Sequence, residues 1–271
     1  MKKYIYVGFI GTGNMGGALA TAVKKSGFGV KLYDPDTEKA TALAEKIGAR
    51  VAKSNLELIT TCSFVFLGVK PHMLEGLAEE IRPTLDKMGL GAPLLISMAA
   101  GTSIARLEEL FGDLFIIRIM PNTPVSVGKG MTLWCPNHRV IYPQIEAFTD
   151  MMSHSGCLDR IDERLIDAAS AVSGCGPAFV YMFIEALADG GVLCGLPRDK
   201  AMTLAARTLE GASAYLMESG QHPGKLKDNV CSPGGTTIEG VRTLEAGGFR
   251  SAATEAVIAA YEKTLKLAKK D

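Results

Sequence analysis

The sequence predicts an α/β protein in which a doubly wound parallel sheet is followed by an all-α second half. Three observations support this fold class. Short apolar runs alternate with helical stretches over the first 160 residues, a glycine-rich turn joins the first run to the first helix, and long alanine-rich segments follow residue 161. Strand, helix and strand in repeated order are typical of a parallel sheet covered by helices. We therefore expect two domains, 1–160 and 161–271.

Several apolar runs in the first domain alternate little, as strands buried on both faces should. Helices are expected at 37–47, closed by Gly48, and at 73–86, and Ser54 with Glu57 forms a capping-box pattern that opens another helix. The strands are expected at 4–10, 29–34, 49–53, 63–69, 93–98 and 115–120, with a further pair near 131–135 and 157–161.

The second half combines helical apolar spacing with many small residues, which allow close helix contacts. A half of this size built from such helices would expose much apolar surface by itself, so we infer an intertwined homodimer. Its helical segments are expected at 162–172, 177–193, 198–218, 236–246 and 250–269.

The glycine-rich turn has the pattern Gly11-x-Gly13-x-x-Gly16 and lies between a strand and a helix. Gly11 permits the tight turn, Gly13 lets the backbone approach a pyrophosphate, and Gly16 lets the helix pack on the strand. The pyrophosphate would lie at the helix N-terminus, where unpaired N–H groups favour an anion. The motif predicts a Rossmann-type domain that binds a dinucleotide.

Asp34 ends the second apolar run, 23 residues after Gly11. A carboxylate at this place suits a ribose 2′-hydroxyl and opposes a 2′-phosphate. Lys31 and Lys39 would soften that repulsion. Asp34 therefore favours NADH slightly over NADPH.

Composition argues for a small ligand. Lys+Arg and Asp+Glu both number 29, and this balance gives no nucleic-acid footprint. The six cysteines lack any C-x-x-C pair and the four histidines are dispersed, so we expect reduced thiols and no metal site. The start of the chain mimics a secretory signal, but cleavage there would remove the glycine motif. No other segment approaches the ~20 uninterrupted apolar residues of a membrane span, so we expect a cytoplasmic protein without membrane or nucleic-acid partners.

A second informative stretch, Ser232-Pro-Gly234-Gly235-Thr236-Thr237, lies ahead of a helical segment. Such a loop forms a backbone nest at a helix N-terminus, with two hydroxyl groups beside it, and suits a small carboxylate ligand. The alternative is a plain turn between helices with Thr236 or Thr237 as the N-cap. The residues alone leave both interpretations open.

Nearly the whole chain resembles the pyrroline-5-carboxylate reductases, which reduce Δ1-pyrroline-5-carboxylate to L-proline in proline biosynthesis. The most specific block is Asp228-Asn-Val-Cys-Ser-Pro-Gly-Gly-Thr-Thr237. The other matching segments are 8–15, 69–72, 99–101, 120–124, 173–177, 185–191 and 221–224.

The resemblance implies an NAD(P)H-dependent oxidoreductase that dimerises through an interlocked helical domain, with possible assembly of dimers into a ring. It implies that the loop closes over the substrate from the partner protomer, so that active sites are shared. The substrate residues are then Ser232, Gly234, Gly235, Thr236 and Thr237, and Thr237 is the catalytic residue because it would hydrogen-bond the ring nitrogen. From the motif and the resemblance together, the cofactor residues are Ile10, Gly11, Thr12, Gly13, Asn14, Met15, Asp34, Asn55, Val69, Lys70, Pro71, Met98, Ala99, Ala100 and Asn229.

Two positions depart from the pattern of the family. Many members that prefer NADPH carry a small or polar residue in place of Asp34, and some relatives place a glutamate near the substrate where this chain has Gly220. Glu163, at the start of the second half, is interpreted as an exposed acid of a first helical turn rather than a cofactor contact.

The alternatives belong to other classes. A related imine reductase would share this plan. A β-hydroxyacid dehydrogenase would need a lysine base that 162–172 and 177–193 do not contain. A non-catalytic nucleotide sensor would have no need of the full loop, and a structural ring protein would not explain the glycine motif together with Asp34.

Overall fold

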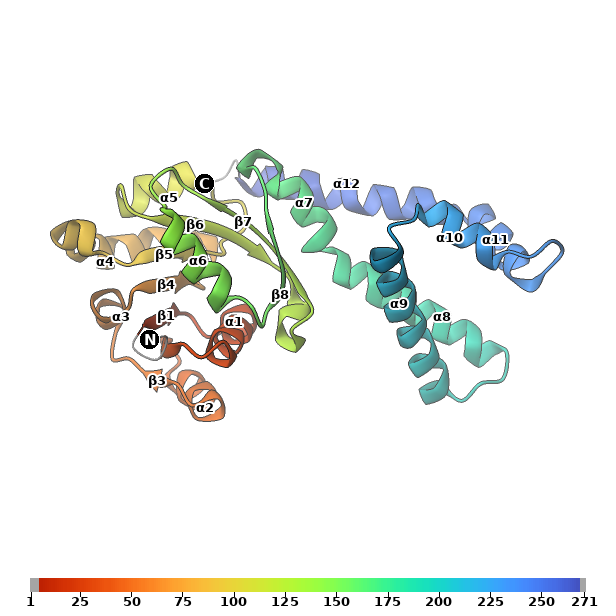
Figure 1. The fold of residues 1–271 in the computed structure, drawn as a ribbon, viewed down its shortest axis with the longest axis horizontal. Helices are drawn as coiled ribbons and strands as arrows, with labels where there is room; N and C mark the ends of the chain where they lie inside the picture. Colours follow the sequence, from red (N-terminus) through yellow and green to blue (C-terminus); the bar gives the residue numbers. More distant parts are fainter. Residues whose placement is uncertain (1–4, 269–271) are drawn as a thin grey trace. The chain divides into compact units, whose positions relative to one another are not determined.

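The computed structural model describes residues 5–268. Its first compact unit contains an eight-stranded sheet with the order β3-β2-β1-β4-β5-β6-β7-β8 (Figure 1). Every predicted strand is present with ends within two residues of those expected, although residue 4 of the first lies outside the described residues. The strands are Tyr6–Ile10 (β1), Gly29–Tyr33 (β2), Arg50–Val51 (β3), Phe64–Leu67 (β4), Leu94–Ser97 (β5), Ile116–Pro121 (β6), Gly130–Pro136 (β7) and Gly156–Arg160 (β8).

The sheet is parallel from β3 to β6, and β1 sits between β2 and β4, with Gly8 opposite Lys31 on one side and Val65 on the other. Strand β7 runs antiparallel to β6, and β8 is parallel to β7. The connection before β7, residues 122–129, is shorter than the dozen or more residues that a parallel crossover needs. The sheet is therefore doubly wound as predicted, but not parallel throughout.

Helices cover both faces of the sheet, and each face has its own apolar core (Figure 1). Leu19, Val23 and Phe148 contribute to one core, and Ile81 and Phe111 contribute to the other. The first face carries α1 (Asn14–Lys25), α2 (Thr37–Ile47) and α6 (Tyr142–Met151), and the second carries α3 (Asn55–Thr61), α4 (Leu74–Met88) and α5 (Ile104–Phe111).

Local sequence signals set the ends of these helices. Gly48 adopts a left-handed conformation with φ of 67° and closes α2 as predicted. Ser54 caps α3 by accepting a hydrogen bond from the Glu57 N–H at 3.2 Å. The Glu57 carboxylate accepts from the Lys53 N–H at 2.9 Å instead of from Ser54, so the second half of the capping box is displaced by one residue.

The second compact unit, residues 176–259, is all helical. Its buried residues are Ala188, Ala201 and Ala205, while Met182 is 69% and Met217 82% exposed. Small residues join α8 to α9, and the large apolar side chains stay on the surface. The helices are α8 (Gly176–Leu193), α9 (Arg198–Ser219), α10 (Pro223–Val230), α11 (Thr236–Ala246) and α12 (Phe249–Ala268), the last of which continues beyond this unit.

Helix α10 is not among the predicted helices. Pro223 occupies its first turn, and the His222 ring nitrogen Nδ1 accepts a hydrogen bond from the Gly224 N–H at 3.1 Å. Gly224 and Asn229 have low helix propensity, and the prediction therefore treats the segment as a loop. The expected last helix, 250–269, is found as α12, and residue 269 lies outside the described residues.

The compact units divide the chain differently from the predicted domains. Residues 5–175 and 260–268 belong to the first unit. Residues 161–175 join it because α7 (Ile166–Ser173) packs on β7. Ile166 is fully buried in a small cluster with Ile104, Leu133 and Cys135. The limit at residue 160 between a dinucleotide-binding domain and a helical dimerisation domain remains a prediction.

Among the described residues, the stretch Glu163–Leu193 is long and apolar enough to cross a membrane by length and composition, and 11% of its apolar window is buried. One such stretch is weak evidence for a span. The sequence prediction of no membrane span did not identify this stretch, because it counted only uninterrupted apolar residues.

Candidate functional site

The glycine turn has the geometry that its sequence predicts. Gly11 has φ of 92°, and its N–H donates to the Tyr33 carbonyl at 2.8 Å. A Cβ atom at Gly16 would lie 2.3 Å from the Gly11 carbonyl oxygen, so no larger residue would let α1 approach the turn so closely. Backbone geometry therefore requires glycine at both positions.

Gly13 is different, because a Cβ atom there would meet no protein atom within 4 Å. Gly13 is the N-cap of α1 and has no side-chain capping bond. The first backbone bond of the helix runs from the Gly17 N–H to the Gly13 carbonyl at 2.8 Å. The N–H groups of Asn14 and Met15 thus begin a helix whose open end suits an anion.

Asp34 holds the turn from the end of β2. Its Oδ2 accepts from the Thr12 N–H at 2.7 Å and from the Thr12 hydroxyl at 3.0 Å, and its Oδ1 accepts from the Asp36 N–H at 3.0 Å. Burial raises the pKa of the Asp34 carboxyl, but these hydrogen bonds and the charge of Lys39 outweigh burial, so the pKa lies below its usual value. Asp34 is an ionised acceptor at neutral pH.

Lys31, which was expected to soften the repulsion of a 2′-phosphate, makes its contacts away from Asp34. Its ammonium donates to the Thr61 hydroxyl at 2.9 Å, lies 4.0 Å from Glu57, and lies 5.0 Å from the centre of the Tyr6 ring. Because successive side chains of a strand point to opposite faces, Lys31 lies on the face opposite its neighbours in β2. Lys39 is the lysine whose charge acts on Asp34.

The other predicted cofactor residues of this unit lie at the carboxyl ends of strands. Residues 69–71 follow β4 and residues 98–100 follow β5, while the glycine turn follows β1. These strands are parallel neighbours, so their carboxyl ends share one edge of the sheet, where ligands bind in such folds. Lys70 is exposed at this edge and Ala99 is buried.

Asn55, the first residue of α3, is 9% exposed. Its amide nitrogen donates to the Glu80 carboxylate at 2.8 Å, which fixes the orientation of the amide. Its Oδ1 atom is buried and has no partner among the described residues. A buried acceptor without a partner is costly and marks a place where a donor is expected.

The predicted substrate loop joins α10 to α11 in the second unit. Gly234 has φ of 66°, and the Gly235 N–H donates to the Ser232 carbonyl at 3.0 Å. Gly235, not a threonine, is the N-cap of α11, and no side chain caps this helix. Neither Thr236 nor Thr237 is therefore the N-cap that the plain-turn interpretation expected. Both threonines are exposed in the first turn of α11.

Asn229, the remaining predicted cofactor residue, lies in the last turn of α10, close in sequence to this loop. The structure thus gathers the predicted residues into two groups. One is the edge of the sheet in the first unit, and the other is the turn between α10 and α11 in the second.

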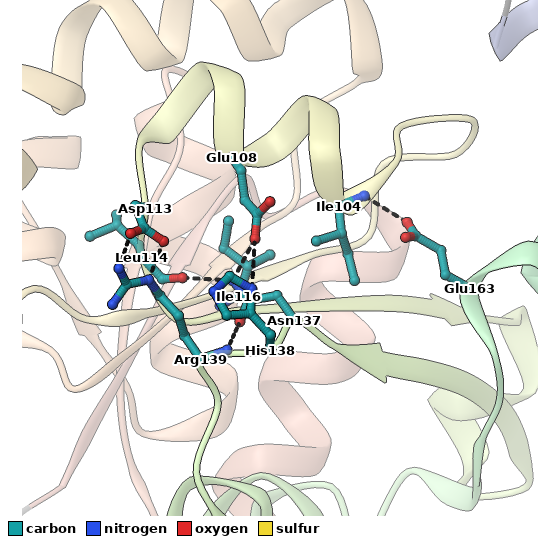
Figure 2. Close-up of polar contacts among 9 residues, drawn as sticks. All are labelled: Ile104, Glu108, Asp113, Leu114, Ile116, Asn137, His138, Arg139 and Glu163. Atoms are coloured by element: carbon teal, nitrogen blue, oxygen red, sulfur yellow. Dashed lines mark hydrogen bonds and ion pairs between the residues drawn. The ribbon is translucent and has the colours of Figure 1, made fainter.

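The prediction missed an ion-pair network around Arg118 of β6, which is 3% exposed. Its guanidinium lies 3.2 Å from Glu163 and 2.7 Å from Asp167 of α7. Glu163 also accepts from the Ile104 N–H at 2.6 Å, at the start of α5 (Figure 2). Glu163 is an acid of a first helical turn, as interpreted, but it is half-buried and paired instead of exposed. The signal was an arginine inside an apolar strand, because a buried charge requires a partner.

A hollow of about 630 Å³ lies beside this network. At its wall, the Asn137 amide donates to Glu108 at 2.9 Å and to the Leu114 carbonyl at 2.8 Å (Figure 2). Burial raises the pKa of the Cys135 thiol, which also lines the hollow, to about 11, so this thiol is a poor nucleophile. None of the predicted cofactor or substrate residues lines the hollow.

Comparison with known proteins identifies the family. Residues 163–267 match the family model for pyrroline-5-carboxylate reductase dimerisation, and residues 6–101 match that for NADP oxidoreductase, coenzyme F420-dependent. The pyrroline-5-carboxylate reductase of Escherichia coli strain K12 is 41% identical over 97% of this chain and 98% of its own length. The chain belongs to the pyrroline-5-carboxylate reductase family. The reductase of Pisum sativum is 38% identical over 96% of this chain and 95% of its own length.

Solved structures agree with membership of the pyrroline-5-carboxylate reductase family. The crystal structure of Plasmodium falciparum pyrroline carboxylate reductase with NADP bound superposes with a TM-score of 0.87 at 36% identity, over 97% of this chain and 99% of that one. An imine reductase from Pseudomonas sp. reaches a TM-score of 0.61 at 15% identity, which shows a shared fold only. The match to the dimerisation model includes the whole apolar stretch Glu163–Leu193, so its exposed side chains belong to a dimerisation domain.

No group of three or more His, Cys, Asp or Glu side chains that would hold a metal ion occurs among residues 5–268. The polar groups of the predicted site residues are backbone N–H groups, hydroxyls, amides, the Lys70 ammonium and the Asp34 carboxylate.

Proposed function

We propose that this protein reduces Δ1-pyrroline-5-carboxylate to L-proline by hydride transfer from a reduced nicotinamide cofactor. The observation that carries the proposal is the 41% identity to a pyrroline-5-carboxylate reductase over the full chain. It is supported by an open glycine turn at the edge of the sheet and by an uncapped, glycine-led start of α11.

The residues of the sheet edge fit a nicotinamide dinucleotide. Gly13 leaves room for a pyrophosphate against the backbone, and the start of α1 supplies N–H groups to it. Asn55 offers a buried acceptor that lacks a donor. Asp34 and residues 69–71 and 98–100 would line the remainder of the cofactor. When bound, the cofactor supplies the hydride, and the protein supplies position and charge stabilisation.

The loop between α10 and α11 would bind the substrate carboxylate through the backbone of Gly234, Gly235 and Thr236. Thr237, one residue further into α11, would donate its hydroxyl proton to the ring nitrogen or accept from it, and so orient the imine. Residues 232–237 include no acid stronger than a hydroxyl. Imines protonate readily, so orientation is the contribution we expect from Thr237.

Thr237→Ala tests this assignment. We expect kcat to fall about 100-fold without complete loss, because the hydride donor and the carboxylate site remain. Thr237→Ser should recover most of the activity because it keeps the hydroxyl. Thr243→Ala is the control, since the Thr243 hydroxyl only donates within α11, to the Glu239 carbonyl at 3.0 Å. Full activity of Thr237→Ala would refute the role of Thr237.

We further propose that each active site is shared between two protomers, and that dimers assemble into a ring. The match of residues 163–267 to a dimerisation domain supports the proposal, since this segment contains the substrate loop. Mixing two variants of strongly reduced activity tests the sharing. Thr237→Ala subunits and Gly13→Val subunits should regain activity when they form mixed dimers, because one of the two sites then contains no substitution. Recovery of no activity in verified mixed dimers would refute shared sites.

We propose NADH as the preferred cofactor, because the ionised Asp34 would repel a 2′-phosphate. Two unit charges about 4 Å apart repel by about 4 kcal/mol at an effective dielectric constant of 20. The relative from Plasmodium falciparum has NADP bound, so the preference has to be measured on this protein. Initial rates with Δ1-pyrroline-5-carboxylate and each cofactor decide it, and a higher kcat/KM with NADPH would refute this preference.

A cytoplasmic location goes with this function. All six cysteines are free, which suits a reducing compartment.

A further inference from the structure

Asp34 makes hydrogen bonds within its own chain that do not involve a cofactor. Its Oδ2 atom is occupied by both hydrogen-bond donors of Thr12, at 2.7 Å and 3.0 Å. Thr12 is 6% exposed and directly precedes Gly13, the N-cap of α1. The Gly11 N–H adds a third link to the end of β2, at 2.8 Å from the Tyr33 carbonyl.

We propose that Asp34 is a positioning residue for the pyrophosphate loop, because its carboxylate holds Thr12 and keeps the loop formed before the cofactor binds. The inference rests on the proposed function and extends it. Bonds from an N–H and an O–H to an ionised carboxylate are stronger than neutral ones, and they fix both the backbone and the side chain of Thr12.

The geometry also limits what Asp34 offers a ribose. A carboxylate accepts about four hydrogen bonds. The N–H and the hydroxyl of Thr12 donate the two hydrogen bonds that Oδ2 accepts, and the Asp36 N–H donates one to Oδ1 at 3.0 Å. Oδ1 can accept one further hydrogen bond, so a ribose diol would make one hydrogen bond to Asp34 instead of two.

The loop role and the selection role predict opposite effects on a ligand without a ribose. Inorganic pyrophosphate is such a probe, used as an inhibitor competing with NADH. If Asp34 acted only as a negative charge near the site, Asp34→Ala would strengthen pyrophosphate binding. If Asp34 holds the loop, Asp34→Ala should weaken pyrophosphate binding about tenfold, since two charge-assisted hydrogen bonds are lost.

Asp36→Ala is the matched control. Asp36 lies two residues away and caps α2 by accepting from the Lys39 N–H at 3.1 Å, and it makes no hydrogen bond to Thr12. The substitution removes the same charge from the same connection but leaves the Thr12 bonds. The inhibition constant of pyrophosphate should then stay the same or fall.

Thr12→Val removes the hydroxyl bond alone and provides a second, milder variant. It should lower kcat/KM with NADH and with NADPH by the same factor, about threefold, and leave their ratio unchanged. Asp34→Asn, which keeps one acceptor oxygen for the Thr12 N–H, should bind pyrophosphate more tightly than Asp34→Ala.

Three results would overturn the inference: tighter pyrophosphate binding by Asp34→Ala, an altered cofactor ratio in Thr12→Val, or no inhibition of the native enzyme by pyrophosphate. A native enzyme that binds NADH, as measured by fluorescence titration, but reduces no Δ1-pyrroline-5-carboxylate would refute the proposed function. In that case the loop role would still be tested by displacing NADH with pyrophosphate.

Discussion

The two compact units differ in where their apolar side chains lie. In residues 5–175, two cores on opposite faces of the sheet bury large side chains, such as Phe9, Phe66 and Phe111, almost completely. In residues 176–259, the buried residues are three alanines, and side chains such as Tyr181 and Met182 are more than half exposed. The first unit has a core of its own, whereas the second needs another surface to cover its apolar side chains.

The difference bears on function as well as stability. The first unit can form the cofactor edge within one chain, since the edge depends on neighbouring strands and on the Thr12–Asp34 bonds. The second unit carries an exposed loop on helices that a homodimer would stabilise. Cofactor binding and substrate binding should therefore respond differently when the dimer is broken.

Paired Phe→Ala substitutions give the largest expected difference. Phe9 and Phe66 stack with ring centres 4.4 Å apart in the first core, and Phe66 is fully buried. Phe66→Ala should lower the free energy of unfolding by about 3–5 kcal/mol at any protein concentration. Phe249 is 42% exposed, and its ring centre lies 5.3 Å from that of Phe183. Phe249→Ala should therefore lower the free energy of unfolding by less, and the loss should increase with protein concentration. Denaturant unfolding at two concentrations measures both, and equal, concentration-independent costs would contradict the comparison.

A charge introduced on the exposed face of α8 should dissociate the dimer and affect NADH binding by the first unit less. Met182→Asp is expected to shift the protein to monomers in light scattering and to lower activity at least about tenfold, because a buried unpaired charge destabilises an interface. NADH binding should change less than twofold. Leu90→Asp, at a residue of the first unit that is 85% exposed, is the control and should leave the oligomer intact. A dimeric, active Met182→Asp protein would show that this face of α8 is not in the interface.

The smallest expected difference concerns acid stability. The pKa of Asp34 is lowered in the folded state, so its contribution is present above the usual value of 3.8 and is lost as the pH falls through the lower folded value. The stability difference between the native protein and Asp34→Asn should therefore shrink as the pH falls below about 4.

Asp228 in the second unit is the comparison for that measurement. A hydrogen bond from Lys227 and the charge of that lysine lower its pKa, but the pair lies at the surface, where the Asp228 side chain is 67% exposed and solvent screens the charges. Asp228→Asn should change stability little at any pH. A pH-dependent loss as large as that of Asp34→Asn would mean that the Asp34 bonds contribute no more than a surface pair.

Much of this arrangement could be predicted from local patterns. The eight strands, the glycine turn and the caps at Gly48 and Ser54 depend on residues close together in the chain. Helix α10 was not predicted because Pro223 and Gly224 have low helix propensity. In the structure, His222 accepts the hydrogen bond that caps this helix. The direction of β7 was not predicted either, because it depends on a connection too short for a crossover.

The candidate site divides in the same way. The sequence by itself determined that a glycine turn precedes a helix, that an acid ends the next strand, and that a Pro-Gly-Gly-Thr-Thr loop opens a helix, because each is a property of adjacent residues. Only the tertiary structure decided that Asp34 bonds Thr12, that Glu80 orients Asn55, and that Arg118 pairs with Glu163 and Asp167. These contacts join residues 22 to 49 positions apart, and a buried polar group takes whichever partner the packing of the sheet and helices places beside it.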